Sequence, residues 1–344
     1  EDFTRTILAD LDRAIRNCAR DCLHLSDSVA NSWFHLGKKH GSLGLPELKF
    51  EIPLMAFKRL VRLKSSDTWV LKDVTSSSWF KCELDRIQRL LPHYRNNQER
   101  LLNDLQRIRT FQGQLCFAVA GGLVNRHLNG TSWFSGNQFV TYLRMRTCSI
   151  GASGHEAEPV HCPYGCTNKV ATLEHILNNC AHMRGMMRYR HNRAQKTITD
   201  QMVASGWTVY ENFRVVALID QCWRLFIPDI VAVSPDGESS LVLDVQCSFE
   251  SHKDVLHERD AAKRKKYSNP AILSAIELKL FGLGHSPRKT SVYGLIFGSR
   301  GAINNVTYNL LFDLGMSKSR IGSILDFISK DSMAIYRMYN SQRP

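Results

Sequence analysis

The chain has 344 residues, of which 43% are hydrophobic and 22% are charged, and its formal net charge at pH 7 is +13. This length allows two or three domains with hydrophobic cores of their own. No run approaches the roughly 18 consecutive apolar residues of a transmembrane helix, and the first residues lack a signal peptide's basic start and apolar run, so we expect no membrane association. Excess positive charge favours polyanionic partners, nucleic acid first, although a ribosomal or merely soluble basic protein could carry the same charge.

Apolar side chains recur at helical spacing through the first 150 residues, which predicts a mostly helical and basic N-terminal half. The expected helices cover 3–22, about 53–64, 83–110 and 136–147. The last of these ends in Arg144 and Arg146, which are candidate contacts to nucleic acid. A stretch rich in Gly, Ser and Pro at 151–159 predicts a linker.

Beyond this linker the pattern changes. A basic helix is expected at about 183–204, and it carries further candidate nucleic-acid contacts at Arg188, Arg190, His191 and Arg193. An α/β region follows, with strands expected at 207–216, 229–234, 240–247 and 291–297 and helices at 253–267, 271–281 and 318–338. The turn at 234–237 should join the second and third strands as a hairpin. The fold class is therefore expected to be α+β, with a mixed sheet flanked by helices in its C-terminal half.

Three of the ten cysteines cluster with a histidine between the linker and the basic helix. Their spacing is Cys162-x3-Cys166-x8-His175-x4-Cys180. Four such ligands suit the tetrahedral coordination of one structural zinc ion, and Gly165 permits the unusual backbone of a metal knuckle. A segment this short cannot hold itself together by burial alone, so we expect zinc to stabilise it. The alternatives are a chance cluster, or a ligand set in which the flanking His161 or His182 takes part.

Two carboxylates interrupt strands that are otherwise apolar. Asp229 follows Pro228 at the start of one predicted strand, and Asp244 lies inside the next. A carboxylate among apolar neighbours is costly unless it is paired or binds a cation. Two of them on adjacent strands could share Mg²⁺ or Mn²⁺, which phosphodiester cleavage uses to activate water and offset charge on the phosphate. The alternative is a simple Pro-Asp turn, which is how we interpret Asp236.

Nucleases of the PD-(D/E)xK type carry a lysine two residues after the second acid, where this chain has Gln246. The following helix offers Lys263 and Lys266, which share one helix face. An ammonium group can reach the same place from a neighbouring helix, so Lys263 is the catalytic candidate and Lys266 its competitor. The alternative for this basic run is a solvated face, a phosphate contact or a nuclear localisation signal.

The order of these pieces along the chain is distinctive. A CCHC cluster is followed by a basic helix with Arg190-His191-Asn192, a Pro-Asp strand, an Asp strand and Lys-x-x-Lys-Tyr. This order resembles the C-terminal region of non-LTR retrotransposon polyproteins with a restriction-like endonuclease, of which the ribosomal-DNA-inserting, site-specific elements are the best known. Four upstream segments resemble the same family's reverse-transcriptase thumb end and linker, namely Leu11-Asp12-x-x-Ile15-Arg16, Cys22-Leu23-His24-Leu25, Gly41-Ser42-Leu43-Gly44-Leu45-Pro46-Glu47-Leu48 and Leu143-Arg144-Met145-Arg146-Thr147.

The resemblance implies an endonuclease that nicks one strand of duplex DNA, whose exposed 3′ end then primes reverse transcription of the element's RNA. It implies Asp229 and Asp244 as the metal-binding acids, Lys263 as the catalytic lysine, and Arg190 and His191 near the DNA or the active site. It implies a thumb end and linker at 1–150, a zinc knuckle at 151–182 and a PD-(D/E)xK-like endonuclease at 183–344. The rest of the polyprotein would be a further partner, and the expected location is the nucleus.

The chain departs from the family pattern in places. No polymerase Tyr-x-Asp-Asp motif occurs, so this piece cannot polymerise DNA by itself, and the usual thumb Trp is replaced by Cys22. The alternatives to an active nuclease are a non-catalytic module that positions DNA or RNA and a decayed, inactive copy. The retained acids favour the enzyme. A transcription regulator is a weaker third alternative, because one finger before an α/β domain fits tandem-finger readers poorly.

Overall fold

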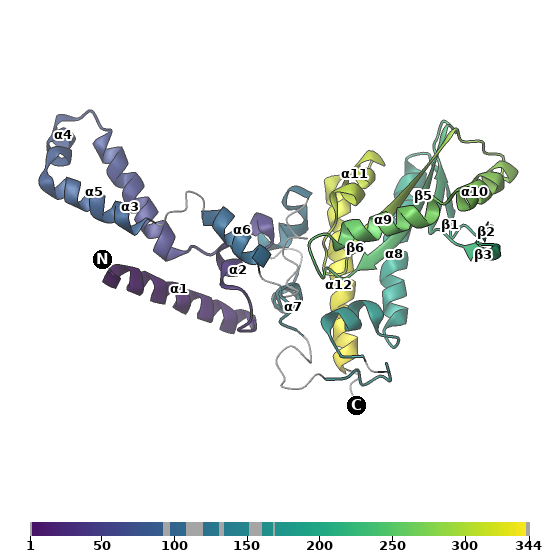
Figure 1. Ribbon diagram of the computed structural model, residues 1–344, viewed down its shortest axis with the longest axis horizontal. Coiled ribbons are helices and arrows are strands. Elements are labelled where there is room, and N and C mark those ends of the chain that lie inside the picture. The colour runs from purple at the N-terminus through teal and green to yellow at the C-terminus, as the bar shows by residue number, and fades with distance from the viewer. Residues whose placement is uncertain are drawn as a thin grey trace. The chain divides into compact units, whose positions relative to one another are not determined.

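The computed structural model describes residues 2–91, 97–107, 120–130, 134–150, 160–167 and 169–341, and the protein is mixed α+β (Figure 1). It forms two compact units, one of residues 1–38 with 42–109 and one of residues 39–41 with 110–344. The division near residue 109 differs from the expected boundary at 150. The expected linker at 151–159 lies outside the described residues.

In the described part of the first unit, residues 2–38, 42–91 and 97–107, every regular element is helical. The elements are α1 (Asp2–Leu23), α2 (Asn31–His35), the 3-10 turn η1 (Lys38–His40), α3 (Leu48–Lys64), α4 (Trp69–Ser76), α5 (Ser78–Leu90) and α6 (Asn97–Arg107). The buried Asp12 of α1 ties α1 to α3, because its carboxylate accepts hydrogen bonds from the Leu48 and Lys49 amides at 2.7 and 3.1 Å. Those amides belong to a helix N-terminus, where a negative charge is stabilising.

The helices expected at 3–22 and 53–64 are confirmed, whereas the helix expected at 83–110 is two helices, α5 and α6. The break has a local cause. Leu91 is extended, with φ −66° and ψ 130°, and it precedes a proline, which disfavours helical backbone in the residue before it.

After residue 119, the described part of the second unit contains the 3-10 segment η3 (Ala120–Leu128) and α7 (Gly136–Arg146). Its remaining helical elements are η4 (His175–Asn179), α8 (Arg184–Ala204), α9 (Val255–Tyr267), α10 (Pro270–Gly282), α11 (Asn305–Asp313) and α12 (Lys318–Ser341). Both η3 and α7 contact the C-terminal part of the chain. Arg126 of η3 forms an ion pair with Asp326 of α12, and the Tyr142 hydroxyl of α7 donates to the carbonyl of Arg300, just after β6, at 2.9 Å. These contacts explain why residues 120–150 belong to the second unit.

The second unit contains a four-stranded mixed sheet in the order β1-β4-β5-β6. The strands are β1 (Thr208–Glu211), β4 (Ile230–Val233), β5 (Ser239–Ser248) and β6 (Lys289–Gly298). The β1–β4 and β4–β5 pairs are antiparallel, and the β5–β6 pair is parallel. The parallel pair is joined through α9 and α10. The hairpin expected around residues 234–237 is confirmed.

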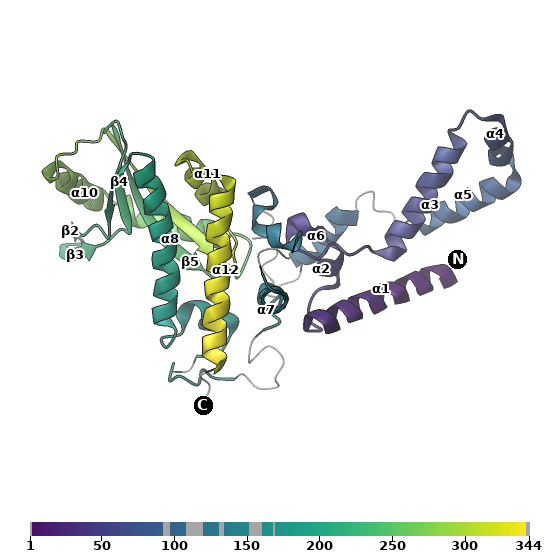
Figure 2. The same cartoon turned by 180° about the vertical axis from the view of Figure 1, so that it is seen from behind.

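Helices cover both faces of this sheet. In Figure 1 α9 crosses in front of β5, and in Figure 2, from behind, α8 and α12 lie side by side over the opposite face. Alternate residues of β4 and β5 therefore enter different cores. Ile230, Ala232 and Leu243 pack with α8 and α12, whereas Val231, Val233 and Val242 pack with α10.

Several elements were not expected from the sequence, α2 and α4 among them. The expected strand 207–216 is two strands, because Asn212 has a positive φ of 51° and ends β1 before β2 (Val215–Ile219) begins. The second strand pairs with β3 (Cys222–Phe226) as a separate hairpin, which was not expected. The short helix α11 was also missed. Among the described helices, none combines the length and apolar content needed to cross a bilayer.

Candidate functional site

The first candidate site is the Cys/His cluster, which is built from a tight turn and a short wide helix. The turn carries Cys162 and Cys166. Its Gly165 has φ 70°, a backbone conformation that residues other than glycine rarely adopt. His175 begins the π-helical segment η4, and its carbonyl accepts from the Cys180 amide at 2.7 Å. This five-residue hydrogen bond widens the turn and brings the last two ligands to the same end.

The four ligand atoms have the geometry of a tetrahedral site. They all lie within 4.8 Å of one another. The Sγ atom of Cys180 lies 3.9 Å from that of Cys162 and 4.0 Å from that of Cys166. A tetrahedral zinc ion with Zn–S bonds of about 2.3 Å places its sulfurs about 3.8 Å apart. His175 Nε2 is buried and makes no hydrogen bond, as expected for an atom that binds a metal. The cluster therefore fits zinc.

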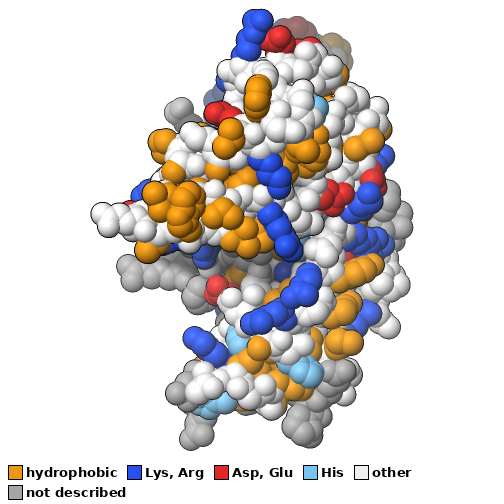
Figure 3. Space-filling view, turned by 90° about the vertical axis from the view of Figure 1, so that its right-hand side faces the viewer, with side chains coloured by type: hydrophobic (Ala, Val, Ile, Leu, Met, Phe, Trp, Pro, Cys, Tyr) orange, Lys and Arg blue, Asp and Glu red, His pale blue; other side chains and the backbone are white. Residues whose placement is uncertain are grey.

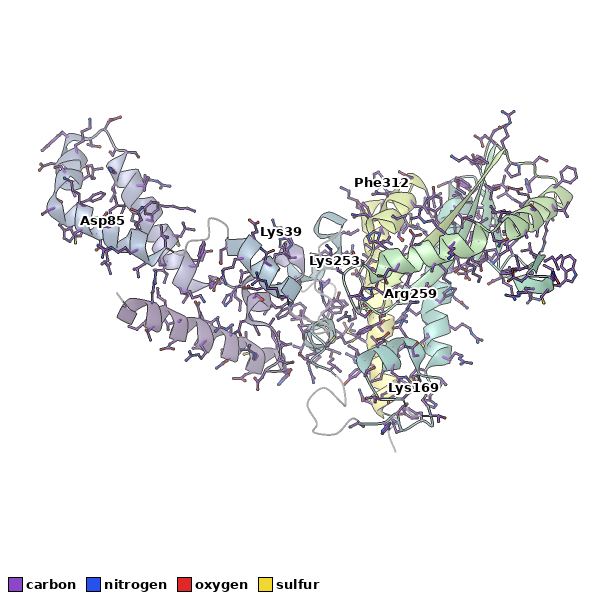
Figure 4. All side chains as sticks on the ribbon, in the orientation of Figure 1. Lys39, Asp85, Lys169, Lys253, Arg259 and Phe312 are labelled. Carbon is purple, nitrogen blue, oxygen red and sulfur yellow. The ribbon has the colours of Figure 1, made fainter. Side chains whose placement is uncertain are left out.

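The surroundings of the cluster favour metal binding by this ligand set. Burial, and then the charge of Lys169 on the loop between the ligand pairs, lowers the pKa of His175 and keeps it in the neutral form that binds zinc (Figure 4). The flanking histidines lie outside the set. His161 is exposed, and His182 stacks on Tyr164 with ring centroids 4.2 Å apart.

The second candidate site is the pair of acids on β4 and β5. Ile230 pairs with Leu243, so one further step of this antiparallel register sets Asp229 opposite Asp244 on the same face of the sheet. Asp229 Oδ2 accepts from the Val245 amide at 2.6 Å and lies 3.2 Å from Nε2 of His191. The two carboxylates are 16% and 7% exposed.

The electrostatics follow from this arrangement. Burial, and then the charge of Asp229, raises the pKa of Asp244, while the Lys263 ammonium opposes that rise. The hydrogen bond to Asp229 raises the pKa of His191 against the effect of its burial. A positive charge close to these two partly buried carboxylates therefore stabilises their ionised forms. Carboxylate oxygens are the ligands that Mg²⁺ and Mn²⁺ prefer.

Both candidate lysines of α9 lie near Asp244, in different ways. The Lys263 ammonium forms an ion pair with Asp244 Oδ2. The Lys266 ammonium lies 3.0 Å from the Tyr267 hydroxyl and 4.4 Å from the centre of its ring. That hydroxyl lies 3.2 Å from both Asp244 Oδ1 and the carbonyl of Ile227. Lys263 therefore meets the acid directly, whereas Lys266 meets it through Tyr267.

Lys263 reaches the acid because α9 lies unusually close to β6. Gly294 of β6 pairs with Asp244 in the parallel register, and its amide donates to Oδ1 of the buried Asp260 at 2.9 Å. A Cβ atom at Gly294 would lie 2.9 Å from Asp260 Cα and 3.1 Å from Lys263 Cβ. Only glycine therefore allows this approach. Asp260, Tyr267 and Gly294 were not predicted as site residues. The sequence signal for them is weak: a carboxylate and a tyrosine on the face that α9 buries, and a glycine inside a strand.

The structure corrects two of the proposed nucleic-acid contacts. Arg146 is fully buried and donates to Asn125 Oδ1 at 2.7 Å, and Arg190 is 1% exposed and donates to the Ser332 hydroxyl and the Leu177 carbonyl at 2.6 and 3.0 Å. These guanidinium groups hold segments of the protein together and do not face a phosphate. Helical periodicity placed both on amphipathic helices, but it could not show that a second helix covers the basic face.

The other candidate contacts keep some exposure. Arg188 is exposed, and Arg144 is partly buried. Arg193 forms an ion pair with Asp331 and lies over the ring of Phe327, with 44% of its side chain exposed. His191 lies beside the acid pair as described above. Arg188 is therefore the clearest remaining candidate for a phosphate contact on α8.

Comparison with known proteins finds relatives that match most of the chain. No protein-family model matches the chain. Two Pol polyproteins from the type-1 retrotransposable element R2 of Popillia japonica are 26% and 25% identical to it, over 87% and 98% of the chain and 40% and 74% of their own lengths. A Pol polyprotein from the type-2 element R2DM of Drosophila melanogaster is 25% identical over 81% of the chain and 26% of its own length.

The chain thus spans from a quarter to three quarters of the relatives it matches. The matches run through both compact units rather than through one motif, since one of them covers 98% of the chain. The chain is therefore homologous, over most of its length, to Pol polyproteins of R2-type non-LTR retrotransposons.

Proposed function

We propose that this chain is the endonuclease-bearing part of a retrotransposon Pol polyprotein. Its active site for nicking DNA would contain Asp229 and Asp244. The observation that carries the proposal is the meeting of three side chains from separate segments. Two acids face each other across neighbouring strands, and the Lys263 ammonium reaches one of them from the following helix. PD-(D/E)xK-like nucleases combine these groups, and the mixed sheet with helices on both faces agrees with such a core.

The two acids would hold Mg²⁺ or Mn²⁺. Such an ion supplies Lewis-acid polarisation of the phosphate and activation of water. The chain's own residues do the rest. Asp229 is oriented by the Val245 amide, which keeps its carboxylate directed across the strand pair. The Lys263 ammonium lies against Asp244, where it can stabilise negative charge that develops on the phosphate oxygens. His191 lies beside Asp229, whose hydrogen bond raises the pKa of the imidazole and so favours its charged form.

The zinc cluster has a structural role in this proposal. It ties the turn at 162–166 to η4, and the Tyr164 hydroxyl of that turn donates to the Tyr339 carbonyl near the end of α12. Metal binding would therefore fix the segment that leads into α8. The nucleic-acid partners would be the target duplex and the element's RNA, with the rest of the polyprotein as a further partner and the nucleus as the location.

A specific observation favours a second candidate function. Lys263 pairs with Asp244 and His191 lies against Asp229, so the cluster could be an ion network that only stabilises the fold. The chain would then be a non-catalytic module that positions DNA or RNA, or an inactive copy. The two candidates differ in one measurable property, the cleavage of a phosphodiester bond.

The deciding experiment is nicking of a supercoiled plasmid in Mg²⁺ or Mn²⁺. We expect open-circle product that EDTA prevents, and its loss in Asp229→Ala and in Asp244→Ala. Asp236→Ala is the matched control, since Asp236 also follows a proline but lies in an exposed turn and should leave nicking unchanged. DNA binding should persist in all three variants. Nicking that persists equally in the two active-site variants would sink the proposal.

A further inference from the structure

The β2–β3 hairpin carries an apolar face that no described part of the protein covers. Val216 pairs with Leu225 and Leu218 pairs with Trp223, so the four side chains form two cross-strand pairs on one side of the hairpin. They are 54%, 57%, 48% and 73% exposed, in the same order. We call these four residues the hairpin face. Exposed patches of large apolar side chains commonly mark binding surfaces.

The hairpin face is held in place from behind. On the opposite side, Val215 and Ala217 are buried against α10 together with Ile276 and Leu280. The turn at Asp220 and Gln221 has positive φ at both residues, 49° and 62°, as in the two-residue turns that fit the twist of a hairpin. The exposed side chains are therefore presented from an anchored element rather than from a loose loop.

The hairpin leads directly into the acid pair. The chain passes from Leu225 to Asp229 in four residues, which an extended chain spans in at most about 14 Å. This connection is fixed, because the Ile227 carbonyl lies 3.2 Å from the Tyr267 hydroxyl and the Pro228 carbonyl accepts from the Phe213 amide at 3.0 Å. Any DNA that reaches the acids would therefore also lie within a few base steps of the hairpin.

Exposed cations lie close in the chain to the hairpin face or to its neighbours. Arg214 directly precedes β2, and Lys265 and Lys266 directly precede Tyr267 of α9, whose hydroxyl donates to the Ile227 carbonyl just beyond β3. In Figure 3, which faces the side of the second unit that carries α10 and the hairpin, apolar side chains gather with Lys and Arg among them. Apolar and aromatic side chains bordered by cations suit bases next to phosphates.

We propose that the hairpin face contacts the bases of DNA opened beside the scissile phosphate, with Trp223 stacking on an unpaired base. This proposal rests on the proposed function, since it names the form of DNA that the same site takes. Trp223 is the most exposed of the four and the only one with an aromatic surface to offer a base. Lys and Arg around it hold the phosphates of the separated strands.

The test compares two DNA probes of equal length, one fully paired and one with a short internal bubble that carries 2-aminopurine. Binding is measured in EDTA, so cleavage plays no part. The wild-type chain should bind the bubble about tenfold more tightly than the paired probe and quench the 2-aminopurine. Trp223→Ala should lose that preference and the quenching yet keep its affinity for the paired probe. Trp223→Phe should retain most of both.

Phe281→Ala is the matched control, because Phe281 is 69% exposed on α10 but lies outside the hairpin face. An equal bubble preference in the wild type and Trp223→Ala would overturn the proposal. So would self-association of the wild type, measured by sedimentation, that Trp223→Ala abolishes, since the face would then bind a second copy. The two proposals fail separately: nicking without a bubble preference removes this one, and a Trp223-dependent preference without nicking removes the nuclease alone.

Discussion

Gly294 lies directly opposite Asp244 in the parallel β5–β6 register, and the space above its Cα is taken by the backbone of α9. The helix is fastened there by the hydrogen bond from the Gly294 amide to Asp260. One turn further along α9, Lys263 meets Asp244. The distance between sheet and helix therefore decides whether the lysine reaches the acid.

Gly294→Ala should push α9 outward and separate Lys263 from Asp244. The added Cβ would meet backbone at 2.9 Å, so we expect about 1–3 kcal/mol of destabilisation and a loss of nicking. The measurements are denaturant unfolding and plasmid nicking. Gly282→Ala is the control, because nothing lies within 4 Å of a Cβ at that position. Equal nicking by the two variants would contradict the role of the close approach.

The two lysines of α9 should separate chemistry from binding. Lys263→Ala removes the ammonium that pairs with Asp244 and should impair nicking more than DNA affinity. Lys266→Ala removes an exposed cation and should weaken affinity more than nicking. Measured together, single-turnover nicking at saturating protein and equilibrium binding distinguish the two effects. If Lys266→Ala were the variant that nicks more slowly at saturation, the assignment of the lysines would be reversed.

Purified protein should carry about one equivalent of zinc, as the four-ligand geometry requires. Cys166→Ser or His175→Ala should release the zinc and unfold the segment around 160–182, while the sheet of β1, β4, β5 and β6 persists. Metal analysis with hydrogen exchange measures both effects. Cys82→Ser is the control, since Cys82 is exposed on α5 and should leave the zinc content unchanged. Zinc-free protein prepared without chelator would contradict the site.

Arg188 and Arg190 should behave oppositely although they are two residues apart. Arg190→Ala removes a buried guanidinium with two hydrogen bonds and should cost about 2–4 kcal/mol of stability. Arg188→Ala should leave stability unchanged and reduce the salt dependence of DNA binding by about one counterion. Thermal unfolding and a salt titration of affinity report the difference. A stable Arg190→Ala variant with weakened DNA binding would restore the sequence-based assignment.

Acid should destabilise the second unit through His127. Burial, and then the charge of Arg146, lowers the pKa of His127 to about 2, and its Nε2 lies 3.0 Å from the Arg146 guanidinium. The neutral ring is favoured in the folded state, so its contribution is complete above pH 6.5 and is lost as pH falls below that value. By pH 5 this loss amounts to about 2 kcal/mol. His127→Gln, which keeps an acceptor, should show a smaller drop in unfolding free energy from pH 7 to pH 5. Parallel pH profiles would contradict this.

The sequence carried local information well. Helices with a clear apolar period, such as α1 and α12, lie where periodicity placed them, and the spacing of Cys162, Cys166, His175 and Cys180 predicted a cluster that the structure brings together. Both depend on residues close in the chain. Charge alone did not distinguish Arg188 from Arg190, because exposure depends on α12, which is distant in sequence. The need for glycine at position 294 likewise depends on how closely α9 packs against β6, which the sequence of the strand does not show.

An ammonium group that arrives from a helix frees the strand position from which it usually comes. Gln246 lies two residues after Asp244 and so on the same side of β5. A lysine at position 246 of β5 and a lysine at position 263 of α9 could thus bring an ammonium group to the same place. A protein with both lysines can lose either one and still keep an ammonium group there. A Gln246→Lys change in the Lys263→Ala background would repeat that exchange.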